Sequence, residues 1–346
     1  MALSQVGLER LNTATTKKIG KRKNIIINGD FRIAERGTSS TSGGYQTVDR
    51  FRCNNANVDE APTQAQHALT SSDSGPYAEG FRFSYHITNG NQTSGAGTDD
   101  AIEILTKLEA GDIANSGWDY TSSSSYLTFS FWVKSSVAQN FFGYLKTADG
   151  TSQRFPFQTG SLSADTWTKI TKKIPGNSNL AFDADAAARV NEGLRIVWAQ
   201  FYGTDRTSSD ATLDTWGAFS SAQQTPDQTS TWYTTNNSTF EITGVQLEVG
   251  EVRTPFETRS LAEEERLCKR YYISTTDFHH ICVNNGESDR WIRFMVEMRA
   301  APTVTTSPTN SVSFAAQNQT KHGFAGNGSG ASLANFNMPW TADAEL

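Results

Sequence analysis

Apolar and polar residues alternate strictly through several stretches of this 346-residue chain, and this pattern most limits what the chain can fold into. In residues 127–134 every second residue is large and apolar, and the same alternation runs through residues 245–249. Successive side chains of a β-strand point to opposite faces, so this period predicts strands with one buried and one polar face. The chain is therefore expected to build antiparallel sheets over a shared core.

Further strand-like stretches recur along the chain between long polar segments. Strands are expected at residues 24–27, 81–87, 101–108, 126–133, 141–145, 167–174, 194–202 and 240–249. Segments rich in Ser, Thr, Asn and Gly lie at 54–80, 88–100, 146–165 and 203–238. Because aromatic residues make up 11% of a chain that is only 36% hydrophobic, many short strands are favoured over packed helices. The sequence predicts a mainly β protein built on an antiparallel β-sandwich of the jelly-roll type.

The last of these strands leads through a turn and a proline into a predicted helix. Ser260 followed by Glu263 has the pattern of a capping box, which places the start of a helix at Leu261. On this helix Glu265 and Lys269 are expected to form an exposed i, i+4 pair. The residues expected to be buried are Leu261, Leu267, Cys268 and Tyr271.

Shorter strand-like stretches follow the helix and are broken by prolines and by a glycine-rich run at 323–330. We therefore expect three parts in the chain. They are an N-terminal arm over 1–23, a jelly-roll sandwich over 24–257, and a short helix with a small C-terminal β subdomain over 258–346.

Charge and cysteine content exclude several classes of protein. The net charge is −6, which argues against nucleic-acid binding by the body of the chain, because phosphate contacts need clustered Lys and Arg. Cys53, Cys268 and Cys282 are an odd number at irregular spacing and fit buried free thiols. No signal peptide and no membrane-spanning run are recognisable. The protein is thus expected to be made in a reducing cytoplasm, with no membrane insertion.

The N-terminal arm combines apolar and basic residues. Leu8 and Leu11 belong to a short apolar pattern, and a basic cluster follows at Lys17, Lys18, Lys21, Arg22 and Lys23. The arm is either a solvated flexible tail or an anchor that docks on a larger, acidic assembly.

Catalytic and metal-binding motifs are missing from the sequence. There is no G-x-S-x-G elbow, P-loop, dinucleotide fingerprint or H-E-x-x-H spacing. His86 is expected on the polar face of its strand, and His279 with His280 is a poor chelate because neighbours in a strand point to opposite faces. We therefore expect no enzyme, no metal site and no cofactor.

Binding chemistry is more plentiful in the sequence. Exposed aromatic rings stack on the apolar faces of sugars, while Asn, Asp, Gln and Arg bond their hydroxyl groups. The candidates for such a glycan-binding site are Trp118, Tyr120, Trp132, Trp216 and Trp232. Each of these aromatics could instead fill the core or a subunit interface.

Short segments spread over residues 24 to 346 resemble a family of tailed-bacteriophage virion proteins, found in phages of marine bacteria and described as tail-fibre or virion structural proteins. The most specific is the block at 240–272, FEITGVQLEVGEVRTPFETRSLAEEERLCKRYY. The others are NIIINGDF at 24–31, DRF at 49–51, FSFWVK at 129–134, MRAAPT at 298–303 and the terminal DAEL at 343–346.

This resemblance implies a non-enzymatic virion structural protein that lies on the particle surface and is generally a homotrimer. It also implies that the sandwich over 24–257 is carbohydrate-binding-module-like. Its implied partners are other virion proteins of the tail or capsid and, through the jelly roll, host surface polysaccharide. A short tail fibre or knob used for host attachment is the preferred interpretation. The alternatives are a capsid decoration, cement or head-fibre protein that stabilises the shell, a polysaccharide depolymerase, and a carbohydrate-binding module of a secreted enzyme.

Overall fold

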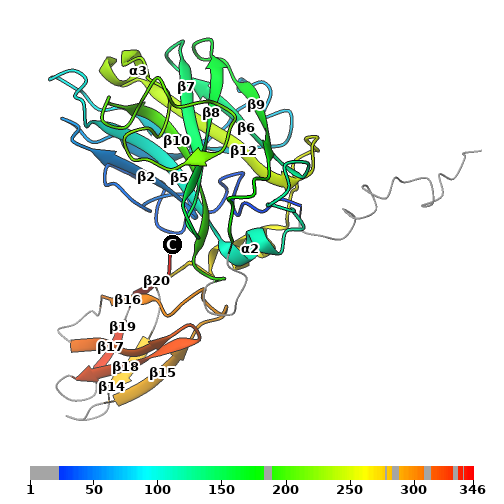
Figure 1. Ribbon diagram of the computed structural model, residues 1–346. Coiled ribbons are helices and arrows are strands. Elements are labelled where there is room, and N and C mark those ends of the chain that lie inside the picture. The colour runs from blue at the N-terminus through cyan, green and yellow to red at the C-terminus, as the bar shows by residue number, and fades with distance from the viewer. Residues whose placement is uncertain are drawn as a thin grey trace, which may run out of the picture.

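The structure is a computed structural model that describes residues 23–182, 189–276, 279–282, 288–307, 313–329, 334–337 and 339–346. Two six-stranded antiparallel sheets pack face to face as a β-sandwich, and smaller sheets follow it (Figure 1). The predicted fold class, a mainly β protein with an antiparallel sandwich of the jelly-roll type, is confirmed.

The first sheet has the strand order β1-β3-β4-β12-β6-β9. Its strands are Ser39–Ser40 (β1), Thr63–Ala68 (β3), Phe83–Thr88 (β4), Thr239–Val249 (β12), Tyr126–Ser135 (β6) and Thr168–Pro175 (β9). The second sheet has the order β11-β8-β7-β10-β5-β2. Its strands are Gly217–Ala218 (β11), Gln153–Ser161 (β8), Asn140–Thr147 (β7), Glu192–Tyr202 (β10), Ala101–Glu109 (β5) and Phe51–Ala56 (β2).

Most predicted sandwich strands are confirmed, and the exceptions have physical reasons. The expected strand at 24–27 is wrong, because this segment has no strand structure. Its three isoleucines are buried beside β12, where Ile25 N–H donates to the Leu247 carbonyl at 2.9 Å without forming a ladder. Strand β8 lies inside the expected loop 146–165 and contains Pro156, which this strand tolerates because its outer neighbour β11 has only two residues.

Large aromatic side chains fill the space between the two sheets. The Trp198 ring of β10 lies 5.7 Å from Phe129 and 5.6 Å from Phe131 of β6, measured between ring centroids. These rings are fully buried and meet edge to face or tilted, which is the favoured geometry for aromatic pairs. The apolar half of the alternating pattern is therefore the sandwich core.

Smaller antiparallel sheets follow the sandwich (Figure 1). One has the order β13-β20-β16, from Tyr272–Thr275, Trp340–Asp343 and Thr303–Thr306. A second pairs β14 (His279–Cys282) with β19 (Ala334–Asn337), and a third has the order β15-β18-β17, from Ser288–Arg293, Gly323–Ser329 and Ser313–Thr320. A separate apolar cluster that includes Phe294, Phe324 and Trp340 packs strands of the first and third of these sheets together.

Three short helices within the described residues connect these layers. They are α2 (Ala110–Ala114), α3 (Thr231–Thr234) and α4 (Leu261–Cys268). Helix α4 begins where the sequence predicted, because Ser260 Oγ accepts a hydrogen bond from the Glu263 N–H at 3.2 Å. The predicted pair of Glu265 and Lys269 is also present, at 3.9 Å.

Helix α4 packs against the sandwich through its last turn. Cys268 and Tyr271 are buried in a cluster with Ile27 and Ile33, as the sequence predicted. The prediction for Leu261 is wrong, because it begins the helix outside this cluster and is 53% exposed.

The described cysteines are unpaired. Cys53 and Cys268 are buried free thiols, and burial raises the pKa of Cys53 to about 12. The side chain of Cys282 lies outside the described residues. In the described part of the chain, no helix has both the length and the apolar character needed to cross a membrane.

Candidate functional site

Two rows of polar side chains cross the outer face of the first sheet. The strand register places His86 of β4 opposite Glu241 of β12, and Glu241 opposite Lys134 of β6. In the neighbouring row His67 of β3 lies opposite Ser84 of β4. These residues alternate with core residues along their strands, so they face away from the core. Four adjacent strands thus form a polar cluster, here called the sheet-face cluster.

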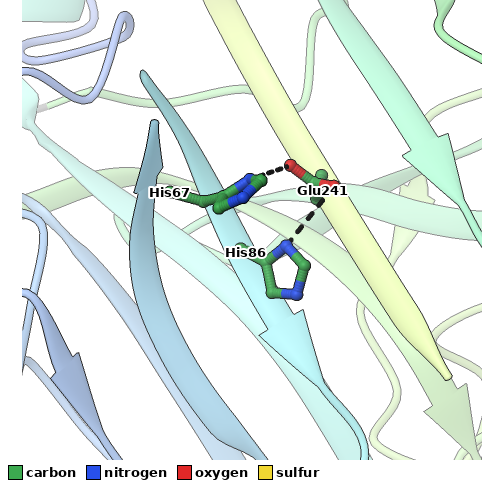
Figure 2. Close-up of side chains that lie close together, drawn as sticks. All are labelled: His67, His86 and Glu241. Atoms are coloured by element: carbon green, nitrogen blue, oxygen red, sulfur yellow. Dashed lines mark hydrogen bonds and ion pairs between the residues drawn. The ribbon is translucent and has the colours of Figure 1, made fainter. Parts of the chain in front are cut away.

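Glu241 is the centre of the sheet-face cluster and is only 2% exposed. Its carboxylate accepts a hydrogen bond from Ser84 Oγ at 2.6 Å and pairs with Lys134 Nζ at 2.9 Å. The Nδ1 atoms of His67 and His86 lie 3.1 and 3.3 Å from its two oxygens (Figure 2). Burial alone would raise the pKa of Glu241, but the hydrogen bonds from its neighbours outweigh burial and hold that pKa far below its usual range. Glu241 is therefore a fixed negative charge.

The negative charge of Glu241 raises the pKa of two neighbouring groups. The hydrogen bond with Glu241 raises the pKa of His67, whose side chain is 48% exposed. Burial acts to lower the pKa of Lys134, but its interactions with Glu241 and Asp73 outweigh burial and raise that pKa. The cluster consequently stabilises positive charge on both groups.

The segment 69–82, which joins β3 to β4, folds over the same face. Asp73 Oδ1 lies 3.0 Å from Lys134 Nζ and accepts a hydrogen bond from Trp167 Nε1 at 2.9 Å. The Lys134 ammonium also lies 4.9 Å from the centroid of the Trp167 ring. Trp167 is thus held at the edge of the sheet-face cluster as a partly buried ring with a charged neighbour.

In the second row the indole and the lysine exchange strands, because Trp132 of β6 lies opposite Lys169 of β9. Its Nε1 donates to Glu79 at 3.2 Å, and the Lys169 ammonium lies 5.1 Å from its ring centroid while also pairing with Glu79. Gly75 lies against the ring, where an added Cβ would come within 2.9 Å of it. Trp132 remains partly exposed among these groups. The face therefore offers two indole rings surrounded by charged hydrogen-bonding groups, a combination suited to binding polar ligands.

Three of the predicted glycan-binding aromatics are buried, which corrects that prediction. Trp118, Trp216 and Trp232 are 3%, 8% and 0% exposed. Each indole N–H donates to a backbone carbonyl, of Ser125, Pro175 and Thr239 respectively. Because the polar end of each ring has a partner inside the protein, the whole ring can be buried. These three side chains belong to the core and cannot stack on a ligand.

The other two predicted aromatics are partly exposed but lie apart. Tyr120 packs against Trp118 and Phe182, with ring centroids 6.3 and 5.0 Å away. Trp132 is the one predicted aromatic that the structure brings into the sheet-face cluster.

The predicted anchoring residues fall mostly outside the described part of the chain. These are Leu8, Leu11, Lys17, Lys18, Lys21 and Arg22. Lys23 is described, and it is held on the sandwich rather than free. Its backbone N–H donates to Glu257 Oε1 at 2.9 Å, and its ammonium donates to the Pro255 carbonyl.

The sequence analysis missed His67, Glu241, Lys134 and Trp167 as neighbours in one site. These residues are far apart in the chain, and only the strand order brings them together. The alternating pattern could have assigned Glu241 and Lys134 to the polar faces of their strands. It could not have shown that β4 and β6 flank β12.

One set within the cluster could hold a metal ion. His67, His86 and Glu241 each offer one ligand atom, and these atoms lie within 4.8 Å of one another. They form the one such set found among the residues that the structure describes. Two imidazoles and a carboxylate are ligands that zinc and similar cations use in proteins.

A pocket of about 730 Å³ lies elsewhere, where helix α2 and the segment before β13 approach residues 295–299. Part of its charged lining is paired, since Arg270 lies 3.2 Å from Glu109 and Lys321 lies 2.5 Å from Glu297. The pocket therefore lies between the sandwich and the smaller sheets. The sheet-face cluster is the better candidate for a functional site.

Comparison with known proteins gives likenesses of shape only. No family model matches the chain, and no curated protein sequence matches it. A candidate sugar-binding protein from Bacteroides thetaiotaomicron is 12% identical with a TM-score of 0.36, and the match covers 66% of this chain and 100% of that one. The N-terminal cellulose-binding domain of a β-1,4-glucanase from Cellulomonas fimi is 6% identical with a TM-score of 0.30, covering 64% and 99%. A family 11 carbohydrate-binding module of a cellulosomal cellulase from Clostridium thermocellum is 12% identical with a TM-score of 0.27, covering 62% and 96%. At these scores the likenesses carry no argument about function.

Proposed function

We propose that this chain is a non-enzymatic structural protein of a tailed-phage virion, a short surface appendage whose sandwich binds glycans of the host surface. Residues 1–23 anchor it to the particle, and residues 258–346 complete a trimer or a distal tip. It is made in the host cytoplasm and works on the virion surface. Its partners are other virion proteins, further copies of itself and host polysaccharide.

The position of the residues that resemble virion proteins supports the first part of this proposal. Segments 24–31, 244–257 and 259–264 are distant in sequence but meet at one buried junction. Arg259 donates to the carbonyls of Asn24 and Ile26, and it pairs with Glu264 at 3.1 Å and with Glu257 at 2.9 Å. The segments that resemble virion proteins thus contain residues that contact one another in the fold, rather than scattered surface positions.

The single observation that carries the glycan part is the placement of Trp132 and Trp167 on one sheet face, each beside a lysine. Lys169 lies near the first ring and Lys134 near the second. Indole rings provide a flat apolar surface for a sugar ring, and the neighbouring charged groups bond its hydroxyls. The face is therefore suited to a polysaccharide that runs across the strands.

The electrostatics of the same site favour binding over hydrolysis. A carboxyl group that acts as general acid needs a raised pKa close to the working pH. The pKa of Glu241 is instead held far below its usual range by its hydrogen-bonding neighbours, despite burial. This carboxylate stays ionised and has no proton to give, which supports a non-enzymatic role for the sheet-face cluster.

The glycan part is tested by titrating the purified full-length chain with surface polysaccharide extracted from the host bacterium, by calorimetry. Trp132→Ala and Trp167→Ala are each expected to weaken binding by about tenfold or more, because each removes one stacking surface. The matched control is Trp291→Ala, since Trp291 is 48% exposed on β15, outside the sandwich. Equal affinity of the Trp132 variant and the wild type would overturn this site, and shortened polysaccharide chains would instead identify a depolymerase.

The virion part is tested on particles. Antibody labelling of intact virions is expected to place the protein on the tail, whereas labelling on the head would favour the decoration or head-fibre alternative. A chain lacking residues 1–23 is expected to form folded oligomers that no longer join particles. If the truncated chain still assembles on virions, the anchor assignment is wrong.

A further inference from the structure

We propose that His67, His86 and Glu241 bind one divalent transition-metal ion of the zinc class on the outer face of the first sheet. This inference goes beyond the proposed function, because it does not depend on glycan binding or on the virion. It rests on the geometry of three side chains from three adjacent strands, β3, β4 and β12 (Figure 2).

The spacing of the ligand atoms fits a single small cation. A metal ion with bonds of about 2.0–2.2 Å holds neighbouring ligand atoms about 3 to 3.5 Å apart. The Nδ1 atom of His67 lies 3.1 Å from Glu241 Oε2, and that of His86 lies 3.3 Å from Oε1. One ligand atom from each of the three residues lies within 4.8 Å of the other two, so small side-chain rotations bring the three onto one ion. The two imidazole rings are 5.0 Å apart between centroids and are tilted by 59°, so both can direct a nitrogen to the carboxylate without stacking.

His86 supplies the second observation, a buried nitrogen that makes no well-aligned hydrogen bond. Its Nε2 lies 3.1 Å from Thr88 Oγ1, whereas its Nδ1 is buried and makes no hydrogen bond despite its distance of 3.3 Å from Glu241. When Nε2 donates to Thr88, Nδ1 presents a lone pair to a carboxylate oxygen. Two such groups repel unless a cation lies between them. A hydrogen bond from the other ring nitrogen is also how metal-bound histidines are commonly oriented.

Lys134 is the competing cation at this site. Its ammonium lies 2.9 Å from Glu241 Oε1 and 3.0 Å from Asp73 Oδ1. Asp73 can therefore retain the lysine when Glu241 turns to a metal ion. The metal enters from the side of Oε2, where His67 is 48% exposed and water can complete the coordination shell. Removing the charge of Lys134 should strengthen metal binding.

The ligand set selects the class of metal. Imidazole nitrogens with one carboxylate suit zinc, cobalt, nickel and copper, whereas calcium and magnesium prefer oxygen ligands alone. Because three strands of one sheet hold the ligands, little backbone order has to be gained on binding. The affinity nevertheless falls at acid pH, because protons compete for both histidines.

The test uses the full-length chain, freed of metal with a chelator and without glycan. Titration with Co²⁺ is followed by visible absorption, and titration with Zn²⁺ by calorimetry. We expect one bound ion per chain, with a cobalt spectrum typical of nitrogen and oxygen ligands. His67→Ala and His86→Ala should each weaken binding by more than about tenfold. Lys134→Met should bind more tightly than the wild type.

A matched control separates this site from adventitious binding by a surface histidine. His322→Ala removes an exposed histidine of the C-terminal sheets and should leave the affinity unchanged. Thermal unfolding of each variant in chelator confirms that it folds. The proposal is overturned if the wild type binds Zn²⁺ no more tightly than the His67 variant. Loss of binding in only one of the two histidine variants overturns the three-ligand assignment.

Discussion

Arg50 and Glu345 form a buried ion pair although 295 positions separate them in the chain. Their side chains are 2% and 5% exposed. The guanidinium also donates to the Lys107 carbonyl at 2.6 Å and lies 3.3 Å from the centroid of the Tyr271 ring. The ion pair thereby holds the last residues of the chain against the second sheet of the sandwich, at the junction with the smaller sheets (Figure 1).

Replacing Arg50 by methionine should destabilise the whole molecule. The change leaves Glu345 buried with Arg36 as its remaining cationic partner, at 3.4 Å. Breaking a buried ion pair on one side costs about 3 kcal/mol, because the buried carboxylate loses its nearest compensating charge. Urea unfolding followed by tryptophan fluorescence measures the loss.

The control is Lys173→Met, which removes an exposed pair with Glu251 and should have no measurable effect. Equal midpoints for the two variants would refute this role for Arg50.

Gly244 is required where β12 changes register against β6. Its φ is +61°, and an added Cβ would come within 2.6 Å of the Phe81 ring. Gly244→Ala should therefore lower the free energy of unfolding by more than about 1 kcal/mol, through backbone strain and crowding together. Gly217→Ala is the control, because Gly217 has no neighbour within 4 Å of its Cβ position and no left-handed φ. Thermal unfolding compares the two, and a Gly244 variant as stable as the Gly217 variant would contradict the argument.

Alternation made some strands recognisable in the sequence, and its absence hid at least one. Strand β6 is recognisable because Leu127, Phe129 and Phe131 all face the core while their neighbours face out. Strand β3, TQAQHA, has no large apolar residue, because it lies near the edge of its sheet and one of its core-facing side chains is Gln64. Burial of Gln64 is possible because it bonds Thr47 and Tyr85. A pattern of hydrophobicity cannot reveal such a strand.

The candidate site was predictable only in its residue types. The sequence offers Trp132 and Trp232 alike as candidate binding aromatics, whereas the structure leaves Trp132 partly exposed and buries Trp232. Whether an indole is buried depends on whether its N–H finds a partner inside, and for Trp232 this partner is the Thr239 carbonyl. Such a contact depends on the fold of the loop and leaves no trace in composition. The sheet-face cluster likewise depends on strand order.

The cap of helix α4 gives a local prediction. Ser260 Oγ satisfies the Glu263 N–H at the start of the helix. Ser260→Ala should cost about 1 kcal/mol and should speed hydrogen exchange of the amides in the first turn, because their acceptor is lost. Exchange followed by mass spectrometry on peptides from α4 measures this. Ser163→Ala, at an exposed position outside the helices, should leave exchange in α4 unchanged. Unaltered exchange in the Ser260 variant would show that the cap does not hold the helix end.

The pairing of His67 with Glu241 makes stability depend on pH. The hydrogen bond that His67 donates to Glu241 raises the pKa of His67 above that of an unfolded histidine, about 6.5. The folded state therefore binds the proton more tightly than the unfolded state does. This contribution is complete below the unfolded pKa and is lost as pH rises through the folded pKa. The lowered pKa of Glu241 keeps its carboxylate ionised throughout this window, and Lys134 and Asp73 also face the pair.

The difference in unfolding free energy between the wild type and His67→Gln should consequently be larger at about pH 6 than at about pH 8.5. Because the His67 side chain is 48% exposed, solvent screening limits the difference to less than about 1 kcal/mol. Urea unfolding in the presence of chelator measures it without interference from metal ions. His322→Gln is the control, because it replaces an exposed histidine that pairs with Glu297 outside the sheet-face cluster. A difference that is equal at both pH values, or larger at the higher one, would mean that Glu241 does not hold the proton on His67.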